Sequence, residues 1–384
     1  MRRKPLSRVL FAGLLEEGST ARSRLAGLRA LGLDMVELDT SGWQPLRGRW
    51  MRSFVARAFL HPSVHRMNAR LRSLLAERQN DVLWLDKGHW TYPSTLAFAR
   101  RRGCAIVHYC TDDLLGRHAH SWLHRRGIAR DDVYLTTNRH NVAELRDRYG
   151  VTAFRAGMGH DPVLLALRPT PRRGTAAVVY VGHWEPHTER GLLALRAAGV
   201  EVGVWGSNWH KARDRSLRQA RFLPHAEYAA TIAGSRIALG FLSRWNRNDS
   251  TGRSFEVPAL GAFLLAERTA EHEFVYGDGT GAALFSTPAE LVEKARHYLA
   301  HPEERAAVAE TGHARLKAAG YSWADHMRRE WALVERALGD PAAASTAADD
   351  APFWSGFRGG APAPDPASRH AAREAKIATA SWSP

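Results

Sequence analysis

The sequence predicts an α/β protein with two successive lobes, each an open parallel sheet flanked by helices. Short apolar runs that end in glycine alternate with helical segments through both halves of the chain, a pattern typical of parallel sheets with right-handed crossovers. A stretch rich in Pro, Arg and Gly ends near residue 175, and a second series of strands and helices follows. We therefore expect domains over 1–160 and 176–338, a linker over 161–175 and a tail over 339–384.

The composition is that of a water-soluble protein. The chain has 384 residues, 45% hydrophobic and 24% charged, and exceeds the usual length of one domain. No apolar run approaches the roughly 20 residues that span a bilayer, so we expect neither a transmembrane helix nor a cleaved signal. Cys104 and Cys110 would sit on one strand, too far apart for a disulfide, which fits a reducing, cytoplasmic compartment. The tail is rich in Ala, Pro, Ser and Asp and is expected to be disordered.

The first lobe is predicted as a series of strands that lead into helices. Strands are expected over 8–12, 35–38, 82–85, 105–109, 133–136 and 153–156, and helices over 21–31, 93–102 and 138–149. Residues 47–78 are expected to form two helices broken at His61-Pro62, because proline has no backbone N–H to give. The first of these carries an apolar stripe flanked by arginines: Trp50, Met51, Phe54, Val55 and Ala58, with Arg47, Arg49, Arg52 and Arg57. Such a helix either packs on the sheet or lies on an anionic bilayer.

Positive charge is concentrated in the first lobe. The chain has a formal charge of +15, and residues 1–160 hold 27 Lys and Arg against 14 Asp and Glu, whereas the remainder holds 27 against 25. A basic half indicates an acidic acceptor, an anionic membrane face or nucleic acid as a partner. The alternative is a high-GC coding sequence, which raises the arginine content without any partner.

Several residues of the first lobe follow strands directly, where open α/β sheets bind ligands. Gly13 and Ser19 come after the first strand, and Lys87 and His89 come after the strand over 82–85. We assign these four residues to the acceptor side of a site, the side that binds the molecule receiving a transferred group. Turn geometry alone is the alternative explanation for the glycine.

Asp112 and Asp113 follow the strand over 105–109 and form the candidate catalytic pair. Adjacent carboxylates repel, so one is expected to keep its proton near neutrality while the other serves as a base. The alternative is that an aspartate caps the following helix. The next segment holds three histidines without Cys or carboxylate at ligand spacing, and we expect no zinc there: His118, His120 and His124.

The second lobe repeats the plan of strand, glycine and helix. Strands are expected over 178–181, 202–205, 222–224, 237–241 and 283–285, with one more after Gly261. Helices are expected over 228–233, as a pair over 289–319, and over 323–338. His183, Glu185 and His187 do not form the HExxH pattern, so a metalloprotease site is unsupported.

The stretch 246–267, NRNDSTGRSFEVPALGAFLLAE, is the centre of the predicted site and reads as a polar loop, a short helix and a strand. We expect the helix to begin near 253–255, because Pro258 fits only a first helical turn and Gly261 is the residue type that ends helices. Such a start gathers polar side chains around free N–H groups that favour an anion: Asn248, Asp249, Ser250, Thr251, Arg253 and Ser254.

Glu256 adds a second feature to this helix start. Its carboxylate can accept two hydroxyl hydrogen bonds, the arrangement that holds a ribose diol. A phosphate site beside a ribose site indicates a nucleotide. The alternative is an ordinary helix start, in which Ser254 caps the helix, Glu256 complements its dipole and Arg253 is solvated.

The segment RSFEVPALGAFLLAER, with the helix AELVEKARHYLAHPEERAAVAETGHARL after it, resembles the carboxy-terminal half of CgeB-like glycosyltransferases. The similarity is densest over 175–336 and thinner over 8–156. It implies the GT-B fold, in which two Rossmann-like domains face each other across a cleft.

The resemblance also assigns donor-binding residues. It implies that Gly182 and Arg190 approach the donor phosphates and that the turn from Gly206 to Trp209 lies near the base; packing in the core is the alternative for the tryptophan. GT-B donor domains usually carry two glutamates eight positions apart. Glu256 matches the second, whereas the first position holds Asn248, in an Asn/Asp-rich loop like that of the CgeB-like group.

These observations predict a glycosyltransferase that moves a sugar from a nucleotide-sugar donor to an unidentified acceptor, either a glycan or an acidic or membrane-associated molecule. GT-B enzymes usually need no metal, so we expect neither zinc nor a cofactor beyond the nucleotide sugar. We expect a cytoplasmic protein, with peripheral attachment at the inner membrane face as an extension. Two alternatives stay open, a non-catalytic protein of this fold that binds a polyanion or nucleic acid and a sugar-nucleotide epimerase. Nucleic acid is the less expected partner.

Overall fold

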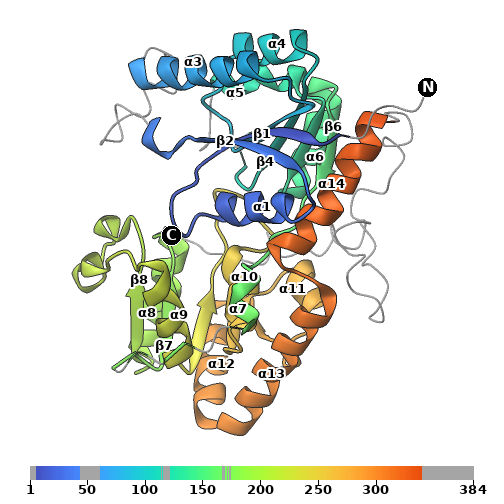
Figure 1. Cartoon of the computed structure of the whole chain (residues 1–384). Coiled ribbons are helices and arrows are strands. Elements are labelled where there is room, and N and C mark those ends of the chain that lie inside the picture. Colours follow the sequence, from blue (N-terminus) through green and yellow to red (C-terminus); the bar gives the residue numbers. More distant parts are fainter. Residues whose placement is uncertain are drawn as a thin grey trace. The chain divides into compact units, whose positions relative to one another are not determined.

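The computed structural model describes residues 6–43, 61–113, 115, 122–166, 169, 170, 172 and 174–339. They form two compact units, whose elements are labelled in Figure 1. Within the described residues, unit 1 holds 6–161, 245–248 and 322–339, and unit 2 holds 162–244 and 249–321. Each unit contains one sheet with helices packed on it. The prediction of an α/β protein with two Rossmann-like domains is therefore confirmed, and the predicted cleft stays a prediction.

Unit 1 is built on a six-stranded parallel sheet in the order β2-β1-β3-β4-β5-β6. The strands are β1 (Arg8–Gly13), β2 (Asp34–Asp39), β3 (Val82–Asp86), β4 (Ala105–Cys110), β5 (Val133–Thr136) and β6 (Thr152–Arg155). The helices are α1 (Thr20–Arg29), α3 (Pro62–Glu77), α4 (Pro93–Arg101), α5 (Trp122–Gly127), α6 (Arg139–Tyr149) and α14 (Trp323–Gly339), with short 3-10 turns η1 (Ser41–Trp43) and η2 (Ile128–Arg130). The strand order reverses between β1 and β3, so the carboxyl ends of these two strands form the position where such sheets bind ligands.

The central strands of unit 1 are buried on both faces, which is why they read as continuous apolar runs. Along β1, Val9 and Phe11 pack in one core with α1 and α14. Leu10 and Ala12 point to the opposite face and pack in a second core with α3 and α4. Figure 1 shows α14 running beside α1, and Trp323 and Trp331 of α14 belong to the first core.

Unit 2 is built on a five-stranded parallel sheet in the order β11-β10-β9-β7-β8. The strands are β7 (Val178–Val181), β8 (Val202–Trp205), β9 (Ile237–Gly240), β10 (Leu264–Glu267) and β11 (Ala283–Phe285). The helices are α7 (Val163–Ala166), α8 (Pro186–Ala197), α9 (His225–Gly234), α10 (Gly252–Ala259), α11 (Ala270–Val275), α12 (Pro288–Ala300) and α13 (Pro302–Ala319), with 3-10 turns η3 (Trp209–Lys211) and η4 (Arg215–Gln219). In this unit the order reverses between β7 and β9.

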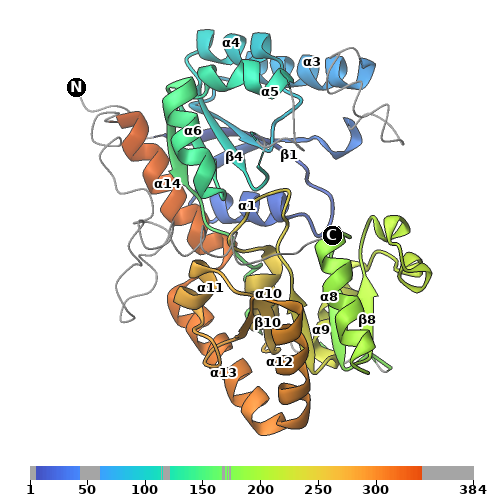
Figure 2. The same cartoon turned by 180° about the vertical axis from the view of Figure 1, so that it is seen from behind.

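The core of unit 2 joins the sheet to α8 and α12, which pack against each other. Figure 2 shows these two helices. Leu192 and Leu195 of α8 and Leu291 of α12 are fully buried against β7 and β9. Helix α10 packs on α13 and on β10. These contacts fix the helix that carries the predicted site residues Arg253, Ser254 and Glu256.

The structure differs from the sequence prediction in several places. Residues 220–224 form no strand, because only Leu223 of the short apolar run is buried while Phe222 is 74% exposed. Helix α11 was not anticipated. The last helix, at the end of the predicted range 176–338, is grouped with unit 1, and the predicted domain bounds stay a prediction.

Other predictions concern compartment and membrane contact. Cys104 and Cys110 are buried free thiols, as expected. In the part of the chain that the structure describes, no helix is both long and apolar enough to cross a membrane. The amphipathic helix expected before His61, the histidines at 118 and 120 and the tail from residue 340 onward lie outside the described residues.

Candidate functional site

The first turn of α10 is fixed by a buried serine. The helix begins at Gly252 with Thr251 as its N-cap, one residue before the predicted range. Ser254 is fully buried, and its hydroxyl accepts the backbone N–H of Thr251 at 3.0 Å. His272 Nδ1 donates to the Glu267 carbonyl at 2.7 Å, so its Nε2 accepts the Ser254 hydroxyl proton at 2.7 Å. Burial lowers the pKa of His272, in keeping with this neutral ring. Ser254, predicted to bind the donor, therefore holds the helix start in place.

Pro258 lies in the last turn of α10, so its predicted place in the first turn is wrong. A proline there leaves the carbonyl four residues earlier without its helical N–H partner. In this structure the Tyr276 hydroxyl donates to that carbonyl of Ser254 instead. Gly261 ends the helix as predicted, with a φ of 72°.

The Glu256 carboxylate is held back over the first turn of α10. Its Oε2 accepts the Tyr228 hydroxyl at 2.9 Å. Its Oε1 would lie 3.2 Å from a Cβ placed on Gly252, so the absence of a side chain at 252 leaves room for this position. Glu256 is half-buried, and Tyr228 is 9% exposed. One edge of the carboxylate is thus fixed by a tyrosine that the sequence analysis did not single out.

Two predicted glycines meet where β7 and β8 end. Gly206 has a φ of 132°, and a Cβ on it would lie 2.0 Å from the Gly182 carbonyl oxygen. The Trp209 indole N–H donates to that same carbonyl at 2.9 Å, and Trp209 is 1% exposed. Trp209 therefore belongs to the core, the alternative named above, and it orients the Gly182 peptide.

Arg253 lies next to Gly182. Its guanidinium carbon is 5.4 Å from the centre of the Tyr180 ring and would be 3.2 Å from a Cβ on Gly182. Its Nη2 donates to the Phe241 carbonyl at 3.4 Å. The end of β7 and the start of α10 thus bring a cation, a glycine turn and a helix N-terminus together, which is a combination suited to an anion.

The remaining predicted donor residues are Arg190, Asn248 and Asp249. Arg190 is exposed on α8. Asp249 belongs to unit 2, and its carbonyl accepts the Thr269 hydroxyl at 2.8 Å. Asn248 is grouped with unit 1, and its side-chain oxygen is buried without a hydrogen-bond partner among the described residues. Asn248 is therefore the one predicted donor residue outside unit 2.

Two buried glutamates at the strand ends were not identified as site residues. Glu185 accepts the Ser243 hydroxyl at 2.6 Å and the Arg244 N–H at 3.0 Å. Glu267 accepts the Leu242 N–H at 2.6 Å and the Arg244 guanidinium at 2.8 Å. Together they fix the backbone that follows β9. Their sequence signal is only a carboxylate near the end of an apolar strand, which is common on protein surfaces.

His187 lies between these two carboxylates. Its Nδ1 is 3.5 Å from Glu185, and its Nε2 is 3.9 Å from Glu267. Burial lowers the pKa of His187 to about 4, and the charges of Arg244 and Arg190 act in the same direction. His187 is therefore neutral near pH 7 and packs against Phe241.

In unit 1 the residues after β3 form a left-handed turn. Lys87 has a φ of 62° and Gly88 a φ of 40°, and a non-glycine residue in this region is uncommon. The Lys87 N–H donates to the Tyr109 carbonyl at 2.8 Å, and its own carbonyl is 3.0 Å from His108 Nε2. The Lys87 ammonium pairs with the Asp112 carboxylate at 2.8 Å. The predicted acceptor-side lysine and one predicted catalytic aspartate are thus in direct contact.

Asp112 and Asp113 each have a cationic partner. Arg247 Nε donates to Asp113 at 2.5 Å, while Asn246 donates to Asp112 at 3.3 Å. Burial raises the pKa of Asp112, but the Lys87 ammonium and these hydrogen bonds outweigh it and hold the pKa below the usual value. Asp112 is therefore not the member of the pair that would keep its proton, and the predicted division of roles between the two aspartates stays a prediction.

His89 lines a small cavity at the ends of β1 and β3. The cavity measures ≈ 20 Å³, room for about one water molecule. Its polar lining comes from Thr40, Asp86, Lys87, His89 and Thr91. Burial lowers the pKa of His89 to about 4, with the Lys87 charge acting in the same direction.

Gly13 and Ser19 have structural contacts beside this cavity. A Cβ on Gly13 would lie 2.9 Å from the Asp86 Cβ, so only glycine fits. Ser19 caps α1: its hydroxyl donates to the Leu14 carbonyl at 2.5 Å and accepts the Arg22 N–H at 3.2 Å. Their acceptor-side role stays a prediction.

The arrangement in unit 2 agrees with a comparison of the sequence with protein families. Residues 188–330 match a family model described as glycosyl transferase-like. The match covers α10 and reaches into α14. No curated protein sequence matches the chain.

Solved structures of similar fold include a glycosyltransferase and UDP-N-acetylglucosamine 2-epimerases. A sucrose-phosphate synthase from Thermosynechococcus elongatus is 11% identical, with a TM-score of 0.58 over 86% of this chain and 99% of that one. Anabaena HepE in complex with UDP is 12% identical, with a TM-score of 0.53 over 85% and 99%. A putative UDP-N-acetylglucosamine 2-epimerase from Listeria monocytogenes is 11% identical, with a TM-score of 0.50 over 86% and 97%. At these identities the likeness concerns the fold.

Proposed function

We propose that this protein is a CgeB-like glycosyltransferase that moves a sugar from a nucleotide-sugar donor to an acceptor. The match of residues 188–330 to a glycosyl transferase-like family supports transfer of a sugar in general. The observation that carries the proposal is that Arg253, at the start of α10, lies next to Gly182 at the end of β7. One helical turn after Arg253, Tyr228 fixes the carboxylate of Glu256.

The donor would bind to unit 2 through two groups of residues. Its diphosphate would contact the Gly182 turn, Arg253 and the N-terminal end of α10, with Arg190 as a further cation. These groups would stabilise the charge that grows on the departing nucleoside diphosphate as the sugar passes through an oxocarbenium-like state. Stabilisation of this kind does not require a metal, so we propose a metal-independent transfer.

The ribose would bind to Glu256. A carboxylate with one oxygen held by Tyr228 presents its remaining lone pairs in a fixed direction, and two vicinal hydroxyl groups can donate to it. This role fits a half-buried glutamate whose carboxylate accepts the hydroxyl of Tyr228.

Unit 1 would supply the acceptor side of the reaction. Asp112 is the better candidate of the two aspartates, because its side chain is 34% exposed whereas that of Asp113 is fully buried. In an inverting transfer Asp112 would take the proton of the acceptor hydroxyl, and in a retaining transfer it would orient that hydroxyl. The excess of basic residues in 1–160 favours an acidic or membrane-associated acceptor at the cytoplasmic face.

The test is a titration of the protein and its Glu256→Gln variant with UDP and with 2′,3′-dideoxy-UDP by calorimetry. We expect the variant to bind UDP at least about tenfold more weakly, since hydrogen bonds to a charged group contribute about 1.5–3 kcal/mol, and to bind the dideoxy analogue as the unaltered protein does. Glu293→Gln, an exposed glutamate of α12, is the matched control. An equal loss of affinity for both ligands, or no loss of affinity, would contradict the ribose assignment. In a separate experiment, a panel of UDP-, GDP- and dTDP-sugars identifies the donor by nucleotide release.

A second candidate is a sugar-nucleotide epimerase, because the epimerase from Listeria monocytogenes shares this fold. An epimerase converts its sugar nucleotide without an acceptor, so the sugar nucleotide itself changes configuration. A transferase gives nucleoside diphosphate that increases when the acceptor is added. NMR of the sugar anomeric signal separates these two outcomes.

A further inference from the structure

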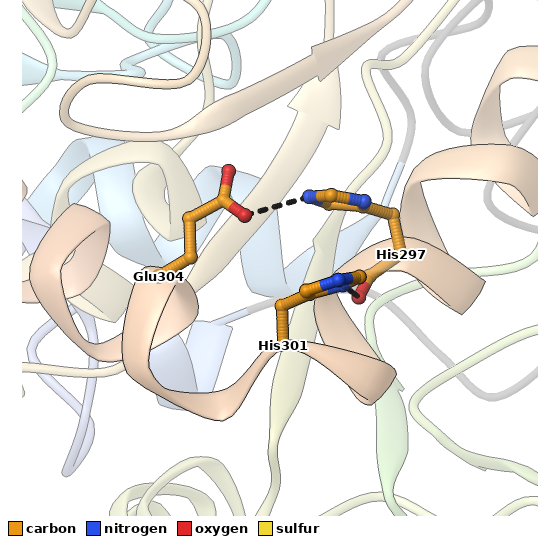
Figure 3. Close-up of side chains that lie close together, drawn as sticks. All are labelled: His297, His301 and Glu304. Carbon is orange, nitrogen blue, oxygen red and sulfur yellow. Dashed lines mark hydrogen bonds and ion pairs between the residues drawn. The ribbon is translucent and has the colours of Figure 1, made fainter.

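Three side chains of types that can bind a metal ion converge at the junction of α12 and α13, in unit 2 (Figure 3). His297 lies in the last turn of α12, His301 links the two helices, and Glu304 lies in the first turn of α13. One ligand atom from each of them lies within 4.8 Å of the other two. His297 Nε2 is 2.7 Å from a carboxylate oxygen of Glu304. All three side chains are exposed to solvent.

The position of His301 is fixed by two contacts. Its backbone N–H donates to the His297 carbonyl at 3.0 Å, and its Nδ1 donates to the same carbonyl at 2.7 Å. The next residue, Pro302, is the first residue of α13, which restricts the backbone of His301 further. The rings of His297 and His301 are stacked with centroids 4.2 Å apart.

The contact of Nδ1 determines which nitrogen of His301 can bind a metal. A neutral imidazole carries one N–H, and Nδ1 uses it for the carbonyl, so the lone pair lies on Nε2. This is the arrangement of most metal-binding histidines, whose second nitrogen donates to a carbonyl or carboxylate that orients the ring. The His297 carbonyl is therefore both the C-terminal acceptor of α12 and the group that orients His301.

We propose that His297, His301 and Glu304 bind one divalent first-row transition-metal ion of the zinc class. Two imidazole nitrogens and one carboxylate oxygen match the preferences of Zn²⁺, Ni²⁺ and Co²⁺, whereas Mg²⁺ and Ca²⁺ prefer oxygen ligands alone. Water completes the coordination at this exposed position.

The surroundings leave the cluster open to such an ion. Arg305, the neighbour of Glu304, donates to the Tyr298 carbonyl at 2.5 Å. Arg296, the neighbour of His297, donates to the Ala198 carbonyl. Both arginines are thus engaged by backbone carbonyls. A bound ion would link α12 to α13 by side chains in addition to the one-residue connection between them. No zinc was expected from the sequence, and this cluster has no local sequence signal: His297 and His301 fall inside a predicted helical pair, and their convergence with Glu304 depends on the turn between the helices.

The test is a calorimetric titration of the full chain with ZnCl₂, compared with His301→Ala, with Glu304→Gln and with His210→Ala as the control. His210 is an exposed histidine elsewhere in unit 2, and a control is needed because the chain contains 19 histidines. We expect His301→Ala to lose one equivalent of Zn²⁺ and Glu304→Gln to bind that equivalent at least about tenfold more weakly, with His210→Ala unchanged. MgCl₂ should give no binding at this site.

A melting experiment gives an independent measurement. Zn²⁺ should raise the melting temperature of the unaltered chain and of His210→Ala, because an ion that binds only the folded state stabilises it, but not that of His301→Ala. Without metal all the proteins should melt alike, since the altered side chains are exposed. The proposal is overturned if His301→Ala retains the full number of equivalents, or if His210→Ala loses as much as His301→Ala. An ordinary surface His–Glu ion pair gives the first of these results.

Discussion

Replacing Tyr228 by phenylalanine tests how the Glu256 carboxylate is held. The change removes one hydroxyl that donates to Glu256 Oε2 at 2.9 Å and keeps the buried ring. A hydrogen bond to a charged group contributes about 1.5–3 kcal/mol net, and about 1.4 kcal/mol corresponds to a factor of ten in affinity. If this bond orients the carboxylate toward a ribose, Tyr228→Phe should weaken the binding of UDP by about 10- to 100-fold.

The assay is calorimetry with UDP on Tyr228→Phe, Glu256→Gln and the double variant. Because the tyrosine acts through the glutamate, the double variant should bind no more weakly than Glu256→Gln alone. Tyr149→Phe, which removes a hydroxyl in unit 1, is the control and should bind normally. The reasoning is refuted if Tyr228→Phe binds UDP like the unaltered protein, or if its effect adds fully to that of Glu256→Gln.

Two further predictions concern stability. Burial raises the pKa of Glu330 to about 8. A carboxyl whose pKa is raised on folding stabilises the folded state fully below its unfolded pKa of about 4.3. This stabilisation is lost as the pH rises to about 8, at up to about 1.4 kcal/mol per pH unit. Glu330→Gln keeps an acceptor for the Gly157 N–H. In urea unfolding at pH 5 to 8, its free energy of unfolding should fall less with pH than that of the unaltered protein. An equal fall of the free energy of unfolding in both proteins would count against this prediction. Gly206→Ala should lower the free energy of unfolding by at least about 2 kcal/mol, because its Cβ would lie 2.0 Å from the Gly182 oxygen. Gly199→Ala, with a φ of 78° and no atom within 4 Å, adds the backbone strain without that clash and should be milder; equal losses would show that strain alone is responsible.

Local sequence signals were sufficient for most of the elements. Each central strand is a short apolar run buried on both faces, so its existence does not depend on the neighbours it later finds. The start of α10 was also predicted within one residue, because a polar loop before an apolar turn has few other conformations. The end at Gly261 followed from the conformational freedom of glycine.

The errors share a different cause, which is a partner distant in sequence. Pro258 is tolerated late in α10 because the hydroxyl of Tyr276 reaches the carbonyl that the proline leaves free. The pKa of Asp112 is lowered by Lys87, which comes from the neighbouring strand end and was not predicted as its partner. Tyr228 reaches Glu256 from α9 across 28 residues of chain. None of these contacts has a local sequence signal.

The place of α14 in unit 1 has a consequence for biosynthesis. The last helix completes the core around Val9, Phe11 and Trp84, yet it is the last part of that core to leave the ribosome. All of unit 2 is translated while α1 already covers part of this face of the first sheet but α14 is still missing. An apolar face that is only partly covered favours association with other chains during synthesis. For the same reason, a fragment that stops at residue 161 lacks part of its own core.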